Sequence, residues 1–438
     1  MSNYDLPCRA FRNDLIIVHQ CIKGTEYAVI KDPDTEKYTR LSKDVFKITK
    51  YFDGSKSLNQ IFKIVQLTLD PDMTMEILES IKNSFMRSKL LVKTQLEKNT
   101  IALEKKRAAR EDKLLEIKGM FMYFRIPFGN PERFFDKLYP YIKWLWSPTA
   151  AFLMISLVIS AVLFILFHLD EVGLGMTTIA SYSGNKLVLV ASLYFILFFT
   201  VIIHELAHGF TCRHFGGSVK ELGLLFMLFN PCMYCNVSDS WLFPKRSQRL
   251  LVTSAGVISE AVIGSFCIFL WYFSQNGTLL NIIAYQVMCI TSIKSALFNC
   301  NPLLKYDGYY ALSDLLEIPN LKQKSSKYLG YFVRTRIFRK PTDPQEEATE
   351  SSTCLVYLTY AILSMVYIVT LMGSMFFIML PPLFIQMMGV FGAILWFCLA
   401  VILLKFILWK RILFLSDFIK DKWRLFWSQF VAVKGIKL

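Results

Sequence analysis

Two histidines and a glutamate near the middle of the chain have the types and spacing of a metal site. In the segment VIIHELAHGFTCRH, His204 and His208 are four residues apart, so on a helix both imidazoles lie on one face. Two imidazoles at this spacing can bind one Zn²⁺ at about 2.0–2.1 Å. Glu205, beside the first histidine, can accept a proton from a water molecule whose pKa zinc lowers towards about 7. The pattern predicts hydrolysis assisted by zinc.

A zinc site of this kind needs a third protein ligand. His214 lies ten residues after His204, as in one zinc-protease motif, but that motif bends at a glycine where this chain has Thr211. An unbroken helix would carry His214 away from the face that His204 occupies. Asp307 is the better candidate, because the segment FNCNPLLKYDGYY interrupts the chain with a proline and a glycine after an apolar stretch. Such irregular backbone is tolerated at membrane depth where it lines a cavity.

The elements expected to hold these residues are membrane-spanning helices. The chain has 438 residues, 54% of them hydrophobic, which exceeds what a soluble core of this size needs. A helix needs about 20 apolar residues to cross the hydrocarbon core of a bilayer. Six stretches meet this length, near residues 148–168, 187–208, 250–273, 279–299, 354–379 and 384–408. The predicted fold class is an α-helical polytopic membrane protein with about six spans and a small N-terminal α+β winged-helix-like cytoplasmic domain.

The net charge of +15 follows the predicted spans rather than forming a phosphate-binding groove. The loops expected outside, 169–186, 274–278 and 380–383, contain no Arg and only Lys186 at a boundary. The other loops and the C-terminal tail are rich in Lys and Arg, so we expect a multi-pass cell-membrane protein with both termini cytoplasmic. We expect the lipid bilayer as a partner and no nucleic acid. The polar N-terminus has no apolar h-region, which predicts no cleaved signal peptide.

Four regions are expected along the chain. Residues 1–95 form a domain in which a hairpin around DPDTEK precedes helices at Ser42–Tyr51, Leu58–Leu67 and Met75–Leu91. Residues 96–147 form a charged helical linker and an interfacial segment. Residues 148–345 form the membrane core, and residues 346–438 add two spans and a cytoplasmic tail.

Together, HELAHGFTCRHFGG and NPLLKYDG resemble the two signature segments of intramembrane metalloproteases of the site-2 protease type. The resemblance covers about residues 120–345. It implies a zinc metalloendopeptidase in which His204, His208 and Asp307 bind the metal. It also implies that Glu205 is the catalytic general base and acid.

One position departs from the family pattern. Where the family carries a G-P-x-x-N element, this chain has Gly256-Val257-Ile258-Ser259-Glu260. Glu260 can either orient the substrate backbone or form a buried ion pair with Lys294, one span away. We favour the ion pair.

The N-terminal region is similar to small PqqD-like domains, through the run VIKDPDTEKYTRLSKDVFKITKYFDGSKSLNQI. Such domains bind a leader peptide by adding a strand to a sheet edge beside a helix. The resemblance implies a groove between Tyr27–Lys31 and Met75–Leu91. The pairing of the two regions resembles bacterial peptide zinc metalloproteases. It implies a ribosomally made, modified-peptide precursor as substrate, with residues 1–95 binding its leader.

Several alternatives stay open at this stage. The substrate can instead be a membrane-anchored regulator, or the chain can be a non-catalytic peptide exporter or immunity protein that keeps the fold. Nitrogen and oxygen ligands also suit iron or cobalt. Cys232 and Cys235 form a C-x-x-C pair that can bind metal or cycle as a disulfide, although we favour a re-entrant or interfacial loop in LGLLFMLFNPCMYC.

Overall fold

A computed structural model of the chain describes residues 6–22, 24–35, 37–95, 97, 99–100, 102–103, 106–107, 123–129, 131–180, 186–227, 230–337, 351–382, 384–385, 388–401 and 405. The chain divides into two compact units, Met1–Leu321 and Lys322–Leu438. All candidate metal ligands belong to the first unit. The charged helical linker expected in the first part of residues 96–147 lies largely outside the described residues.

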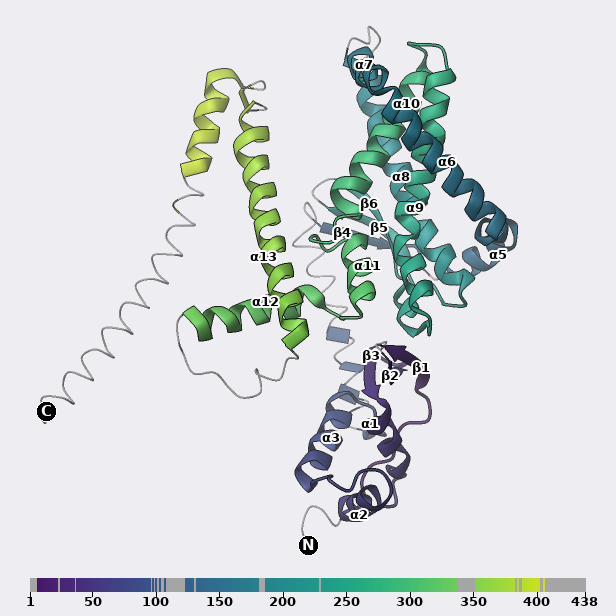
Figure 1. Cartoon of the computed structure of the whole chain (residues 1–438), viewed down its shortest axis with the longest axis vertical. Coiled ribbons are helices and arrows are strands. Elements are labelled where there is room, and N and C mark those ends of the chain that lie inside the picture. The colour runs from purple at the N-terminus through teal and green to yellow at the C-terminus, as the bar shows by residue number, and fades with distance from the viewer. Residues whose placement is uncertain are drawn as a thin grey trace, which may run out of the picture. The chain divides into compact units, whose positions relative to one another are not determined.

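The first unit begins with a small α+β domain. An antiparallel sheet of order β1-β2-β3 precedes three helices (Figure 1). The elements are β1 (Ile16–Ile22), β2 (Thr25–Lys31), β3 (Tyr38–Ser42), α1 (Lys43–Ile48), η1 (Thr49–Tyr51), α2 (Leu58–Thr68) and α3 (Met75–Arg87). The predicted hairpin is confirmed as β2 and β3, and the predicted helices are confirmed with shifts at their ends.

Capping residues and apolar spacing explain where these helices begin and what they bury. The Ser57 hydroxyl accepts a hydrogen bond from the backbone N–H of Gln60, and the Gln60 side chain accepts one from the backbone of Ser57. This capping box satisfies two backbone donors at the start of α2. Leu58, Ile61 and Val65 follow at helical spacing and are buried. They pack into one core with apolar residues of the sheet and of α3.

The prediction that Tyr27–Lys31 forms a sheet edge to which a peptide strand can be added is wrong. These residues belong to β2, the central strand, which pairs with β1 on one side and β3 on the other. Because both edges of β2 are already hydrogen-bonded, a peptide strand cannot be added there. The prediction failed because β1 was not recognised, since the run Ile16–Ile22 lacks strict polar and apolar alternation.

The remainder of the first unit is a helical bundle with a second small sheet. Its elements are β4 (Tyr123–Pro127), α5 (Glu132–Ile142), η2 (Lys143–Trp146), α6 (Pro148–Phe167), α7 (Leu169–Ala180), α8 (Lys186–His214), β5 (Leu222–Met227), β6 (Asn230–Cys235), η3 (Ser238–Leu242), α9 (Arg246–Phe273), α10 (Leu279–Lys294), η4 (Ser295–Asn299) and α11 (Asp307–Leu316).

Four helical segments of this unit are long and apolar enough to cross a membrane, namely Pro148–Phe167, Ala191–His214, Arg246–Phe273 and Leu279–Asn299. They match the first four predicted spans. Only 11% of the apolar window of α6 is buried, and its exposed side chains include Phe152, Leu153 and Phe167. Contiguous apolar surface of this kind is rare on soluble monomers and is suited to lipid.

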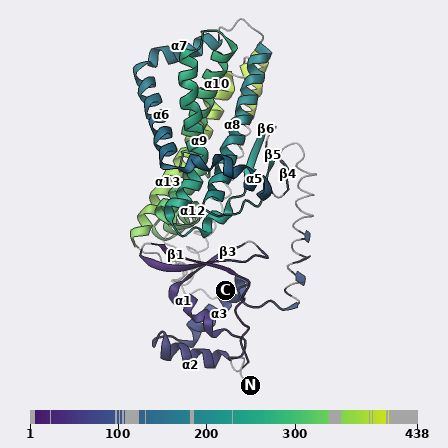
Figure 2. The ribbon, with the colours of Figure 1, turned by 90° about the vertical axis from the view of Figure 1, so that its right-hand side faces the viewer.

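Helix α9 lies between α8, α10 and α6 in the bundle (Figure 2). Glycines let its neighbours approach closely. A Cβ at Gly264 would lie 2.6 Å from the hydroxyl of Thr291 on α10. A Cβ at Gly256 would lie 2.4 Å from the His204 ring on α8. Real Cβ atoms do not come this close, so the packing of α9 depends on these two glycines.

The second sheet is antiparallel, has the order β4-β5-β6, and lies with β6 against α8. The segment expected to be a re-entrant or interfacial loop is therefore the β5–β6 hairpin. Tyr123–Pro127, expected to belong to the interfacial segment, adds a third strand to it. This strand was missed because its partner lies far along the chain.

The second unit contains α12 (Leu321–Phe332) from its second residue onward, η5 (Val333–Ile337), α13 (Ser351–Ser374) and η7 (Met375–Met379). The segment Thr353–Pro382 is the fifth helix long and apolar enough to span, and it matches the fifth predicted span. Where the sixth was predicted, the described residues contain a shorter apolar helix, Met388–Val401. The predicted cytoplasmic tail lies outside the described residues.

Candidate metal centre

Helix α8 carries His204, Glu205 and His208 on one turn near its C-terminal end. The preceding residues of the helix are almost all apolar, so these three interrupt an otherwise uniform apolar run. Both histidine side chains are buried, and their Nε2 atoms lie 3.2 Å apart. The expectation that both imidazoles share one face of a helix is therefore confirmed.

An irregular loop after α10 brings Asp307 to the same place. The π-helical turn η4 ends the helical run, and the chain becomes helical again at Asp307, the first residue of α11. A Cβ at Gly308 would lie 2.6 Å from the carbonyl carbon and oxygen of Cys300. Only glycine permits this approach between the loop and the first turn of α11.

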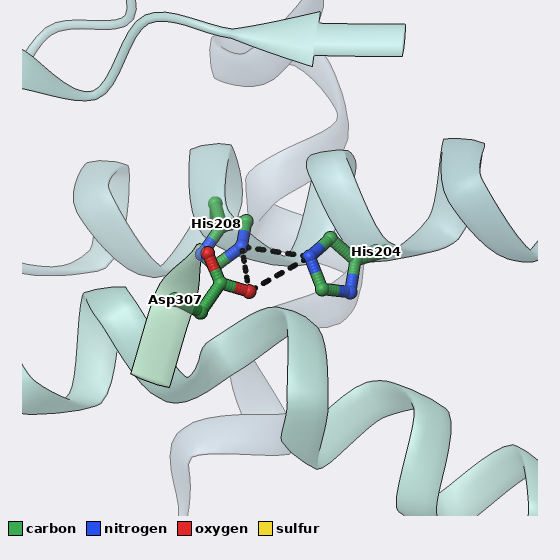
Figure 3. Close-up of side chains that lie close together, drawn as sticks. All are labelled: His204, His208 and Asp307. Carbon is green, nitrogen blue, oxygen red and sulfur yellow. Dashed lines mark hydrogen bonds and ion pairs between the residues drawn. The ribbon is translucent and has the colours of Figure 1, made fainter. Parts of the chain in front are cut away.

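The three side chains point toward one another (Figure 3). Oδ2 of Asp307 lies 2.9 Å from Nε2 of His204 and 3.3 Å from Nε2 of His208. Four ligands at tetrahedral angles, about 2.0–2.1 Å from a Zn²⁺ ion, are about 3.3 Å from one another. The observed triangle of donor atoms, with sides of 3.2, 2.9 and 3.3 Å, is close to that size. The donor set thus fits one divalent ion and supplies three of the four ligands of a tetrahedral site.

The charge state of Asp307 suits this role. Burial disfavours its ionised form, but the two imidazoles that face it outweigh burial and hold the pKa of the carboxyl below its usual value. The carboxylate is therefore an anionic ligand at neutral pH.

Contacts at the far side of each imidazole, a hydrogen bond for His208 and a close carboxylate contact for His204, set its orientation. Nδ1 of His208 lies 2.7 Å from the backbone carbonyl oxygen of Val252 on α9. Nδ1 of His204 lies 2.7 Å from Oε1 of Glu260, also on α9. When each Nδ1 donates its hydrogen to such an acceptor, the Nε2 lone pair is left for the metal.

Glu260 pairs with Lys294, as favoured from the sequence, and also contacts His204. Its Oε1 atom lies 2.5 Å from Nζ of Lys294, so the favoured ion pair is present. The same oxygen faces His204, and Ser295 donates a hydrogen bond to the other oxygen. The contact with His204 was missed, although Gly256 and Glu260 lie one turn apart and so face the same neighbour.

Comparisons with models of protein families, with curated proteins and with solved structures find no match to this chain. What the site can do therefore follows from its own geometry and donor chemistry.

A cavity of about 300 Å³ opens beside the donor triangle. Glu205, His208 and Asp307 reach it from α8 and α11. The backbone of Cys235 on β6 hydrogen-bonds the Glu205 carboxylate. The remaining lining residues are Cys235, Asn236, Val237, Ser238, Ser240, Trp241, Arg249, Thr253, Tyr310 and Asp314. The Glu205 carboxylate and two of the three donor residues, His208 and Asp307, thus share one cavity.

A second cavity of about 410 Å³ lies on the other side of Asp307, between α9 and α11. Its lining is largely apolar and includes Leu250, Val257 and Leu315. Asp307 borders both cavities. Asp307 is therefore reached from two cavities, of which the second is the more apolar.

His214, the alternative third ligand, lies apart from the donor triangle. Its Nδ1 lies 2.9 Å from the Tyr139 hydroxyl, and its ring stacks on Trp146 at 5.2 Å between centroids. Among the described residues, the group that can hold a metal is His204, His208 and Asp307, without His214.

Cys232 and Cys235 are free thiols on β6. Burial raises the pKa of both thiols, which keeps them protonated at neutral pH and lowers their reactivity. Neither belongs to a group of metal-binding side chains among the residues that the structure describes. Their positions support a structural role in the hairpin.

Proposed function

We propose that this chain is a membrane-embedded zinc metalloendopeptidase of the site-2 protease type. The observation that carries the proposal is the triangle of buried donor atoms from His204, His208 and Asp307, with Glu205 in the adjoining cavity. Three protein ligands and one open position are typical of catalytic zinc sites. Five apolar helices support placement of this site in a multi-pass membrane protein. We also propose that both termini are cytoplasmic.

The protein residues have distinct roles in the proposed reaction. When bound, zinc would lower the pKa of water and polarise the scissile carbonyl. Glu205 takes a proton from the attacking water and returns it to the amine that leaves when the C–N bond breaks. Asp307 stays an ionised ligand throughout, and His204 and His208 stay neutral ligands. Glu260 and the Val252 carbonyl keep the two imidazoles oriented.

An extended peptide suits the cavity beside this site. Among the described residues β6 pairs only with β5, so its other edge can accept backbone hydrogen bonds from a substrate strand. We propose as substrate a ribosomally made precursor of a modified peptide, cut at the cytoplasmic membrane face. Its leader would bind residues 1–95 at an edge other than that of the central strand β2.

A second candidate is regulated cleavage of a membrane-anchored protein. The apolar cavity between α9 and α11 favours it, because a substrate helix leaving the bilayer could reach Asp307 through such a space. Cleavage of a membrane-anchored test protein and of a soluble precursor by the same preparation would distinguish the two substrate classes.

The decisive experiment measures metal content and peptide cleavage for the wild type, Glu205→Ala and Asp307→Ala. We expect about one zinc per chain and cleavage for the wild type. Glu205→Ala should keep zinc and lose activity, whereas Asp307→Ala should lose zinc. If both variants keep zinc and biological effect, the site is not catalytic and a peptide exporter or immunity protein is the better reading.

A further inference from the structure

One face of the N-terminal sheet carries polar residues that are nevertheless buried. The pairing of Gln20 with Tyr27 and of Lys31 with Tyr38 places these four side chains on the same face. Gln20 and Lys31 are only 3% and 5% exposed. The opposite face, with Ile30 and Leu41, packs on the helices of the same domain. The polar face must therefore be covered by another part of the unit.

The segment that covers it follows β6 in the chain. Nζ of Lys31 lies 2.5 Å from Oδ1 of Asp239, and the Tyr38 hydroxyl donates to the same oxygen at 2.9 Å. The backbone and hydroxyl of Ser218 donate to Oδ2 at 3.2 and 2.5 Å. Asp239 is 8% exposed, so this ion pair is buried.

A second contact fixes the same segment through its backbone. The side-chain amide nitrogen of Gln20 donates to the backbone carbonyl oxygens of Trp241 and Phe243, at 2.8 and 3.0 Å. The sheet thus contacts Asp239 and Trp241 in η3 and Phe243 directly after it.

The same short segment forms a wall of the metal cavity. Ser238, Ser240 and Trp241 line the cavity that Glu205 and Asp307 also reach. Residues of η3 therefore contact the N-terminal sheet on one side and the proposed substrate space on the other. A change in how the sheet docks would change the shape of that space.

We propose that Lys31 and Asp239 are positioning residues through which the N-terminal sheet holds the η3 wall of the metal cavity. The N-terminal domain then completes the substrate site, in addition to any binding of a leader. The inference rests on the proposed peptidase function, since it identifies residues that shape its substrate site.

Because both charges are buried, loss of either one should disrupt the contact between the sheet and η3. An ion pair removed from water is weak evidence for stability, but loss of one partner leaves the other charge buried and unpaired. Lys31→Met keeps most of the side-chain volume and leaves Asp239 without its cation. The wall would then be released, whereas the donor atoms, which lie on α8 and α11, would stay in place because Lys31 pairs with Asp239 of η3.

The test uses the full-length, zinc-loaded protein in nanodiscs and a short fluorogenic peptide without a leader. Lys31→Met is compared with Lys31→Arg, which keeps the charge, and with Lys43→Met. Lys43 pairs with Glu26 on the surface of the same domain, with both side chains more than half exposed at 53% and 56%, and so serves as a matched control. Zinc content, kcat, KM and hydrogen exchange of residues 236–243 are measured for each.

We expect Lys31→Met to keep zinc, to raise exchange in residues 236–243, and to lower kcat/KM on the order of tenfold, mainly through KM. Lys31→Arg should recover part of the loss, and Lys43→Met should resemble the wild type. If Lys31→Met should fail to fold, Gln20→Leu removes the second contact and is expected to raise exchange in the same residues.

Unchanged exchange in residues 236–243 and unchanged KM in Lys31→Met would overturn the inference. Loss of zinc together with kcat in both Lys31→Met and Gln20→Leu would overturn it too, because the docked sheet would then support folding of the whole unit and not the cavity wall alone. If the wild type holds zinc but cleaves no peptide, the peptidase proposal fails. The exchange comparison then still decides whether Lys31 holds the cavity wall.

Discussion

At the scale of single residues, the metal centre is set by donor chemistry. Two neutral imidazoles and one carboxylate give a net charge of −1, which a divalent ion would overcompensate, so a metal bound there would stay an effective Lewis acid. The same donors suit iron or cobalt. The triangle therefore indicates where a metal would bind, and metal analysis would determine which ion is present.

Glu260 should strengthen metal binding without touching the metal. It faces Nδ1 of His204 and is 1% exposed, so it orients the ring and increases its basicity. We expect Glu260→Gln to weaken zinc binding about 10–100-fold. Competition with a chromogenic chelator measures this. Ser259→Ala is the control, because Ser259 donates a hydrogen bond to the carbonyl of Gly256 in its own helix. Equal affinities in the two variants would contradict the role given to Glu260.

His214 should be dispensable for the metal. We expect His214→Phe to keep about one zinc per chain, because its ring contacts Trp146 and Tyr139 rather than the donor triangle. Loss of the hydrogen bond with Tyr139 should lower stability by about 1 kcal/mol. Zinc analysis and thermal unfolding measure the two effects. A variant without zinc would show that His214 is a ligand in the working protein.

The residue types and spacing predict the ligands but not what orients them. His204 and His208 are identified by their separation of one helical turn, and Asp307 by the interrupted backbone around it. The acceptors of their Nδ1 atoms, Glu260 and the Val252 carbonyl, depend on how α8 rotates against α9. That rotation is decided by packing, which no local pattern in either helix encodes.

At the scale of elements, the close approach of α8 and α9 at Gly256 places the His204 ring. A Cβ at this position would lie 2.4–2.6 Å from three ring atoms. We expect Gly256→Ala to displace the ring and lower zinc affinity about tenfold or more. Gly173→Ala on α7 is the matched control, because a Cβ there meets nothing within 4 Å. If both variants bind zinc like the wild type, the helices can separate without disturbing the site.

Long apolar helices could be predicted from the sequence, and the small sheets only in part. Five helical segments were recognised because each carries a long apolar run, which is a local signal. The β5–β6 hairpin and β1 were missed, and so was β4, whose partner β5 lies beyond two predicted spans. Strand pairing over such separations leaves no periodic trace in either strand.

At the scale of the whole chain, the first unit joins its N-terminal domain to the cavity that holds the metal ligands. Sequence reasoning treated residues 1–95 as a separate recruitment domain, because nothing in the run containing Lys31 indicates a partner two hundred residues away. In the structure, Lys31 and Gln20 are buried although they lie on a polar face of the sheet, which indicates that another segment covers this face. Only the folded arrangement brings Asp239 to it.

The docked sheet should respond to acid in a defined direction. Burial disfavours the charged Asp239, but hydrogen bonds from Lys31, Ser218 and Tyr38 outweigh burial and hold the pKa of this carboxyl below its ordinary value of 3.8. The undocked state therefore binds more protons near that pH, so docking is complete above the ordinary pKa and is lost as the pH falls through the lower, docked-state pKa.

We expect hydroxyl-radical labelling of Trp241 to stay constant from about pH 7 to 4 and to rise below about pH 3.8. In Asp239→Asn, which cannot ionise, labelling should already be high at neutral pH and should lack this step. A step of the same size and midpoint in both proteins would place the acid response in other carboxylates and remove Asp239 from the contact that holds the cavity wall.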